Sequence, residues 1–172
     1  MNKLIRQDER EFQLVVPNVK RPSYTVVLNS LNAATRTGTG ANICSYRFDW
    51  SVLPDVAYEV HMTYMGELNN VDATKIAQVF CDLGVPPNVY EARSTTTALS
   101  SNYIGFLESY IVGANSFLHA EEGTNNPFYL NGRPSLQEFT VRVLDNAGDP
   151  FTASGATALG EYVICLHFVP RL

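Results

Sequence analysis

The sequence predicts an all-β protein, an antiparallel β-sandwich of about eight strands arranged as a single jelly roll. Apolar and polar residues alternate with a period of two in several segments, which is typical of strands with one buried face. Clusters of Gly, Pro, Asn, Asp and Ser separate these segments, as turns and loops require. No segment has a helical period longer than a turn or two, so a fold of alternating strands and helices is excluded.

Four strands are expected in the first half of the chain. Residues 24–30 place an apolar side chain at every second position, and residues 43–50 alternate inward aromatic residues with Ser45, Arg47 and Asp49. The other elements predicted in this half are a loop at 32–40, a turn at Pro54, a strand at 58–64, a loop at 66–72 and a strand at 76–83.

The second half begins with irregular segments. A short piece around residues 89–90 is expected to pair at an edge, and the Ser/Thr-rich run 93–101 is expected to be a long surface loop. Residues 103–112 have a strong strand pattern, in which Gly105 indicates a bulge or a close backbone approach. Residues 119–126 are expected to form a loop and residues 128–130 a short strand, followed by a tight turn at 131–134.

The strands at 139–145 and 161–168 organise the predicted sandwich. The first alternates apolar and polar residues, whereas the second is apolar on both faces because Val163 and Cys165 lie opposite its core-facing set. A strand that is apolar on both faces is normally central and covered on each side. We therefore expect these two strands, joined by residues 145–160, to form the middle of the sandwich. An immunoglobulin-type sandwich is the second choice, although the cysteine and tryptophan spacing does not fit it.

The chain divides into an N-terminal arm, residues 1–22, and a jelly-roll domain, residues 23–172. The arm has five basic and three acidic residues, whereas the remainder has seven basic and fourteen acidic residues. An acidic body is a poor partner for phosphate backbones, so we expect no direct nucleic-acid binding. No apolar run reaches membrane-spanning length and the first residues do not resemble a signal peptide, so we expect no membrane insertion and no secretion.

The cysteines and histidines do not predict a metal site. Cys44, Cys81 and Cys165 are odd in number and lie in apolar runs, so we expect reduced core thiols and folding in a reducing compartment. Cys165 and His167 stand two residues apart, but structural zinc usually has four ligands. We expect no metal and no cofactor.

No catalytic motif is present either. The sequence has no Gly-X-Ser-X-Gly elbow, and Gly38-Thr39-Gly40 precedes a strand rather than a helix, so it does not fit a phosphate-binding loop. Glu121-Glu122 and residues 145–149 have oxygen ligands but are better explained as a solvated loop and a turn. We therefore expect that the protein is not an enzyme. A cupin-type enzyme is the third choice of function.

The layout of the chain over residues 24–168 resembles that of a known family. Its features are a short N-terminal arm, the segment 46–50 leading into Leu53-Pro54, and the terminal strands 139–145 and 162–168. In this layout the chain resembles the small single-jelly-roll capsid proteins of large icosahedral double-stranded-DNA viruses, the penton and minor capsid proteins. The resemblance implies a non-catalytic virion protein that is assembled in the host cytoplasm and binds other capsid proteins. It also implies five-fold or pseudo-symmetric assembly, most simply a homo-pentamer.

Outward residues of the two terminal strands form the candidate assembly face: Arg142, Val163, Cys165 and His167, with Thr140 beside them. The apolar residues of the arm are candidate contacts with a neighbour: Leu4, Ile5, Phe12, Leu14 and Val16. The alternative function is a carbohydrate-binding jelly roll of the lectin or receptor-binding type. The candidate carbohydrate-binding residues are Glu122, Asn125, Asn126, Tyr129 and Asn131.

Overall fold

The computed structural model describes residues 22–37, 42–68, 76–83, 89–91, 99–112, 115–145, 151 and 159–171. Residues 1–21 of the predicted N-terminal arm therefore lie outside the described residues, and so do all five of its candidate contacts. None of the helical segments in the described part has the length and apolar character needed to cross a membrane.

The described residues form twelve strands and two short 3-10 turns, η1 (Ser30–Asn32) and η2 (Trp50–Val52). The strands are β1 (Tyr24–Asn29), β2 (Thr35–Thr37), β3 (Ile43–Arg47), β4 (Tyr58–Leu68), β5 (Ile76–Cys81), β6 (Val89–Glu91), β7 (Leu99–Ser101), β8 (Tyr103–Val112), β9 (Asn115–Ala120), β10 (Phe128–Leu130), β11 (Glu138–Leu144) and β12 (Leu159–Pro170).

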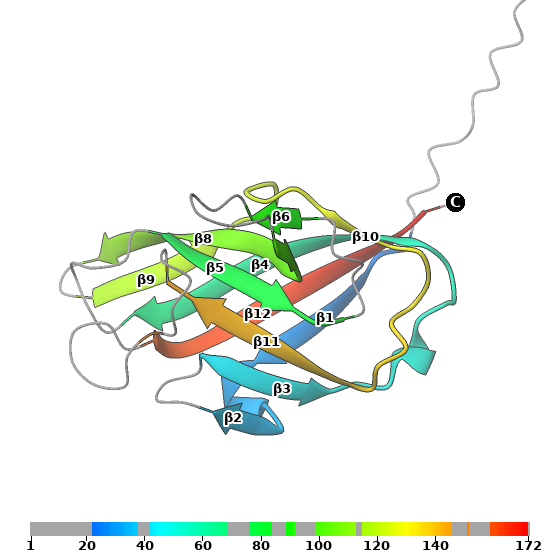
Figure 1. The fold of residues 1–172 in the computed structure, drawn as a ribbon, viewed down its shortest axis with the longest axis horizontal. Helices are drawn as coiled ribbons and strands as arrows, with labels where there is room; N and C mark the ends of the chain where they lie inside the picture. Colours follow the sequence, from blue (N-terminus) through cyan, green and yellow to red (C-terminus); the bar gives the residue numbers. More distant parts are fainter. Residues whose placement is uncertain are drawn as a thin grey trace, which may run out of the picture.

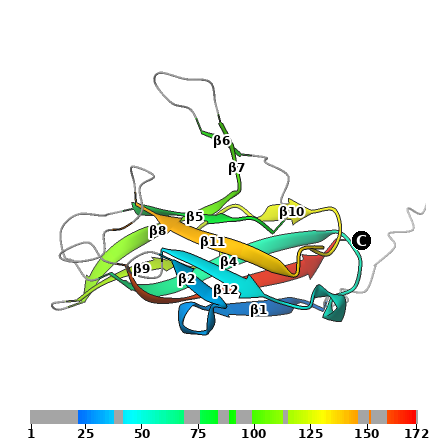
Figure 2. The same ribbon diagram turned by 60° about the horizontal axis from the view of Figure 1, so that its bottom comes forward.

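Eight of these strands form two facing layers, which confirms the predicted antiparallel sandwich with a jelly-roll arrangement. One layer has the order β1-β12-β4-β9, and the other has the order β8-β5-β11-β3 with β2 at its edge (Figures 1 and 2). The β8–β9 pair joins the two layers into one curled sheet, in which all the strand pairs are antiparallel. β10 pairs beside β4, and β6 and β7 form a separate two-stranded sheet.

The strand predictions were correct for seven of the eight main strands and missed β9. Residues 119–126 were expected to be a loop, but His119 and Ala120 belong to β9. The inward residues of β9 include Ser116, which is polar, and Ala120, which is small, so the strand shows no clear apolar alternation. Two further strands, β2 and β7, lie within predicted loops, and the predicted strand 43–50 ends at Arg47 because η2 begins at Trp50.

β11 and β12 are both central, but they lie in different layers. β11 pairs with β3 and β5, whereas β12 pairs with β1 and β4. They meet only through the core, where the ring of Trp50 lies 5.5 Å from that of Phe139 on β11 and 5.6 Å from that of Phe168 on β12. The Trp50 indole N–H donates to the Leu136 carbonyl at 2.8 Å, which fixes the ring between the layers. The core packs on one face of β12 and leaves most residues of the other face half-buried, so β12 is central in its layer but is not enclosed on both sides.

Gly105 confirms the prediction of a close backbone approach. The register of β5 and β8 shifts between Val79 and Phe80, which places a bulge in β8 beside Gly105. A Cβ atom at this position would lie 2.7 Å from Cγ of Asn125. The absence of a side chain at Gly105 therefore makes room for the Asn125 side chain.

Candidate functional site

The outward side of the β1-β12-β4-β9 layer carries the main candidate site, which we call the β12 face. Alternation along β12 buries Tyr162, Ile164, Leu166 and Phe168 and turns the intervening residues outward. Val163, Cys165 and His167 are three of these outward residues, and each is half-buried. Three of the four residues predicted for the assembly face therefore do share one surface.

Antiparallel pairing aligns the outward residues of the neighbouring strands in rows across the β12 face. Val163 lies opposite Met65, which in turn lies opposite His119. The next row along β12 pairs Cys165 with Val27 on one side and with Thr63 on the other. Directly opposed side chains in an antiparallel pair are close enough to contact each other. Residues far apart in the sequence thus form one continuous patch.

The centre of the β12 face is a largely apolar hollow of about 830 Å³. Met65 is 63% exposed at this hollow, and Val27 beside it is 59% exposed. At the β9 side, the Tyr110 ring stacks on Phe117 at 5.3 Å and meets His119 edge-on at 4.7 Å. Side chains that line the hollow include Thr63, Met65, Tyr110, His119, Val163 and Cys165. An exposed apolar hollow of this kind usually marks a binding surface.

Glutamates surround this apolar centre. Glu121 and Glu122, in the turn after β9, line the hollow, and Glu67, Glu108 and Glu161 are exposed on β4, β8 and β12. Among the described residues, the basic side chain beside this face is Arg171, which lies at one end of it with its guanidinium 4.8 Å from the centre of the Tyr129 ring. The β12 face therefore has an acidic rim, and it selects against partners with the same charge.

A small polar network occupies the end of the β12 face away from the hollow. His167 lies opposite His61 in the sheet. Its Nδ1 atom is 3.0 Å from Thr25 Oγ1, and its Nε2 atom is 3.4 Å from Thr63 Oγ1. His61 Nε2 is 2.9 Å from Glu59 Oε1. No group of three or more His, Cys, Asp or Glu side chains in the described part of the chain is arranged to hold a metal ion.

Arg142, the fourth predicted residue, lies on the opposite side of the sandwich. It projects from β11, and its guanidinium lies 5.7 Å from the centre of the Phe80 ring on β5. Thr140 lies on the same outward side of β11, where its hydroxyl is 3.3 Å from Ser45 Oγ. The structure therefore separates Arg142 and Thr140 from Val163, Cys165 and His167.

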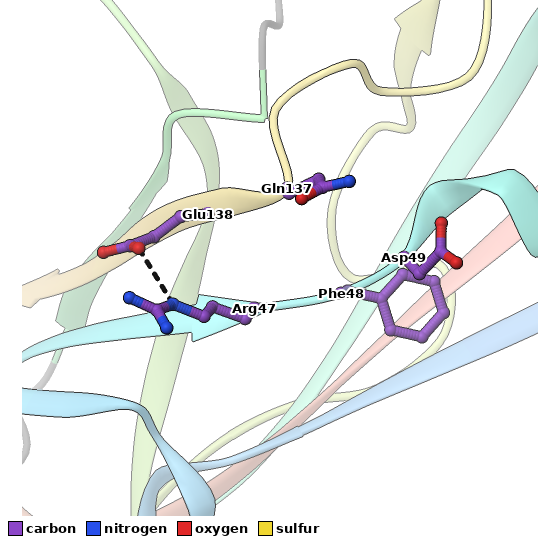
Figure 3. Close-up of a pocket in the computed structure, with 5 residues that line it drawn as sticks. All are labelled: Arg47, Phe48, Asp49, Gln137 and Glu138. Carbon is purple, nitrogen blue, oxygen red and sulfur yellow. Dashed lines mark hydrogen bonds and ion pairs between the residues drawn. The ribbon is translucent and has the colours of Figure 1, made fainter.

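A second, more polar depression of about 490 Å³ lies where β3 ends and β11 begins. Figure 3 shows its lining residues, with the Arg47 guanidinium 3.0 Å from a Glu138 carboxylate oxygen. Both side chains are more than half exposed, and ion pairs of this kind add little stability or specificity. This depression is a weaker candidate than the hollow on the β12 face.

The residues suggested for carbohydrate binding are partly occupied by structural contacts. The Asn125 side chain accepts the Phe106 N–H at 2.8 Å and donates to the Phe106 carbonyl at 3.0 Å. Tyr129 is already stacked under Arg171. Asn126 and Asn131 are exposed. The set does not converge on the hollow of the β12 face, because Glu122 lines this hollow but Asn125, Asn126, Tyr129 and Asn131 do not.

Burial keeps the Cys81 thiol and several phenols of the core in their neutral form. Cys44 and Cys81 are buried, and burial raises the pKa of the Cys81 thiol far above its ordinary value. Burial also raises the pKa of the Tyr64 phenol. Cys165 is the exception to the prediction of three core thiols, since it is half-buried at the hollow.

Sequence reasoning missed most of the hollow. Met65, Tyr110 and His119 come from three strands whose neighbours are set by long-range pairing, and β9 itself was not predicted. The available signal was the doubly apolar pattern of β12, which did identify Val163 and Cys165.

A scan against models of known protein families gives no match, and a search of curated proteins gives no similar sequence.

Proposed function

We propose that this chain is a structural virion protein, a penton or minor capsid subunit that assembles through protein–protein contacts. The observation that supports this proposal best is the β12 face, an apolar hollow with an acidic rim on one side of a jelly roll. Large exposed apolar groups such as Met65 and Val27 are what an assembling subunit buries against its neighbour. The proposed role is non-catalytic and takes place in the virion, after assembly in the host cytoplasm.

The acidic rim favours contacts between unlike surfaces. If two copies paired through the same β12 face, their glutamate rims would come together, and opposed like charges destabilise such a contact. A contact between two different surfaces instead generates a ring when the rotation closes. A contact between unlike surfaces therefore favours a cyclic homo-oligomer, for which a pentamer at the vertex of an icosahedral shell is the simplest form. Other capsid proteins are the further partners that we propose.

The test is the mass of the purified full-length chain in solution, measured by sedimentation velocity and native mass spectrometry. We expect a discrete closed oligomer, most simply a pentamer, or a stable complex with a major capsid protein. Replacing Met65 with Asp places a charge in the hollow, and we expect it to weaken assembly at least about tenfold, a change of roughly 1.4 kcal/mol per interface. The matched control is Val52→Asp, because Val52 is 64% exposed in η2 and does not line the hollow.

Two outcomes would overturn the proposal. One is a strictly monomeric chain at high concentration that also fails to associate with virions. The other is a monomer that binds a defined glycan on an array, which would favour the carbohydrate-binding alternative instead.

A further inference from the structure

The hollow of the β12 face calls for a partner that carries a positive charge within an apolar surface. Glu121 and Glu122 line the hollow with carboxylates. Met65 and Val163 line it with apolar side chains. Unlike charges across an interface favour a contact, whereas like charges oppose it. A second β12 face does not meet this requirement, because its own carboxylates would face those of the first.

The outward side of the other layer carries a surface of the required kind. Arg142 on β11 is exposed there and lies opposite Ile43 on β3 and Phe80 on β5. Phe80 in turn lies opposite Tyr103 on β8, and their rings meet edge-on at 5.8 Å. We call these four residues the Arg142 row. The guanidinium lies 5.7 Å from the centre of the Phe80 ring, so its charge is set in an apolar and aromatic surface.

The acidic side chains that border the Arg142 row already have partners of their own. Glu138, at the start of β11, is paired with Arg47 at 3.0 Å. Asp82, just after β5, accepts the Thr140 N–H with a carboxylate oxygen. No ion pair joins Arg142 to a carboxylate in the part of the chain that the structure describes. Arginines and large aromatic residues often carry much of the binding energy of an interface, so Arg142 is well suited to contact a partner.

We propose that the Arg142 row of one subunit docks in the hollow on the β12 face of a neighbouring copy. The Arg142 guanidinium lies against the Glu121 and Glu122 carboxylates, and the Phe80 ring packs against Met65. This contact rests on the proposed oligomeric function, and it identifies the two unlike surfaces that join one subunit to the next. The two surfaces lie on opposite sides of the sandwich, so each subunit can bind two neighbours, as a ring requires.

Exchange of the charges across this contact is the test, with assembly of the full-length chain measured by sedimentation velocity and native mass spectrometry. Arg142→Glu should weaken assembly at least about tenfold, because it brings like charges together. Glu121→Arg/Glu122→Arg should weaken assembly by a similar factor for the same reason. All three substitutions in one chain recreate the attraction with exchanged signs, so assembly should recover to within about threefold of the native chain. The three residues are exposed, and recovery also shows that the substituted chain folds.

Arg47→Glu is the matched control, because it makes the same change of charge on the same layer. Arg47 is exposed at the opposite end of β3 from Ile43, where Glu138 already holds its guanidinium. We expect its effect on assembly to stay within about twofold, since exposed ion pairs contribute little. Equal weakening by Arg47→Glu and Arg142→Glu would show a response to net charge alone, and would overturn the docking proposal.

Cys165 reports whether the hollow is covered in the oligomer. It lines the hollow, whereas Cys44 is 0% exposed and Cys81 is 1% exposed in the core. At a concentration at which the native chain is assembled and Arg142→Glu is not, Cys165 should react with a thiol reagent at least about tenfold more slowly in the native chain. Cys165→Ser identifies the part of the signal that comes from this residue.

Failure of this contact and failure of the proposed function give different results. A discrete oligomer that Arg142→Glu leaves intact, or that the triple substitution does not restore, would overturn the docking alone. Equal Cys165 rates in the assembled native chain and in Arg142→Glu would also overturn it. A strictly monomeric native chain would contradict the proposed function.

Discussion

At the scale of single residues, the core combines apolar packing with several buried phenols. The Tyr64 hydroxyl is buried and has no hydrogen-bond partner among the described residues. The Tyr58 hydroxyl, in contrast, donates to the Pro54 carbonyl at 2.6 Å. An unpaired buried hydroxyl costs stability, whereas a paired one contributes about 1 kcal/mol. The two tyrosines therefore form a matched pair for mutation.

We expect Tyr64→Phe to leave the free energy of unfolding unchanged or to raise it by up to about 1 kcal/mol, because it removes an unpaired polar atom. Tyr58→Phe should lower the free energy of unfolding by about 1 kcal/mol, because it breaks a hydrogen bond. Urea denaturation of both variants measures the difference in their free energies of unfolding. The comparison holds when the free energy of unfolding falls with urea concentration at the same slope in both variants. A larger loss for Tyr64→Phe than for Tyr58→Phe would contradict the assignment.

At the scale of secondary-structure elements, the strands with strong alternation were predictable and their neighbours were not. The patterns of β4, β11 and β12 are local, since every second residue is buried. The pairing of β12 with β1 joins residues more than a hundred positions apart, and no local pattern specifies it. For the same reason Arg142 was grouped with Val163 in the sequence but lies on the other side of the sandwich. β9 was missed because small inward side chains conceal its alternation.

At the same scale, a side chain rather than a strand pair anchors the turn that follows β9. The turn after β9 reaches β8 through Asn125, whose amide bonds to both backbone groups of Phe106. We expect Asn125→Ala to lower the free energy of unfolding by about 2 kcal/mol, since two hydrogen bonds are lost beside the bulge. Hydrogen exchange at the Phe106 amide should become faster at the same time.

Asn126→Ala is the neighbouring control, because Asn126 is exposed. Its effect on unfolding should stay within about 0.5 kcal/mol. If the two alanine variants were equally stable, the role of Asn125 in anchoring the turn would be refuted.

At the scale of the whole molecule, the fold class was predictable from composition and period, whereas the candidate site was predictable only in part. Two of the hollow's lining residues, Val163 and Cys165, follow from the doubly apolar pattern of one strand. The glutamate rim comes from several segments, and no single segment reveals that these residues surround one hollow. Both layers also contribute buried tyrosines to the core: Tyr46 lies on β3, Tyr64 on β4 and Tyr162 on β12.

These buried phenols predict a loss of stability at alkaline pH. Burial raises the pKa values of Tyr46, Tyr64 and Tyr162 above the ordinary value of 10.0. In the unfolded chain the phenols release their protons above about pH 10, whereas in the folded chain they keep them. The contribution of these phenols to the free energy of unfolding should therefore be constant up to about pH 9 and fall as pH rises further.

Urea titrations between about pH 8 and about pH 11, with tyrosinate absorbance as a second signal, measure this fall. Tyr64→Phe should reduce its slope because one titrating phenol is removed. Tyrosinate formation by all the phenols before the fold is lost would contradict this account.

The place of β12 in the layer has a consequence for how the protein is made. Ribosomes synthesise a chain from its N-terminus, and every strand of the β8-β5-β11-β3 layer has been made once residue 144 has been added. The other layer lacks its central strand until residues 159–170 emerge, and β1 must wait for that partner. Pairing over such a long sequence separation is slow to form. A nascent chain therefore has no complete hollow, and the β12 face forms only after β12 has been synthesised.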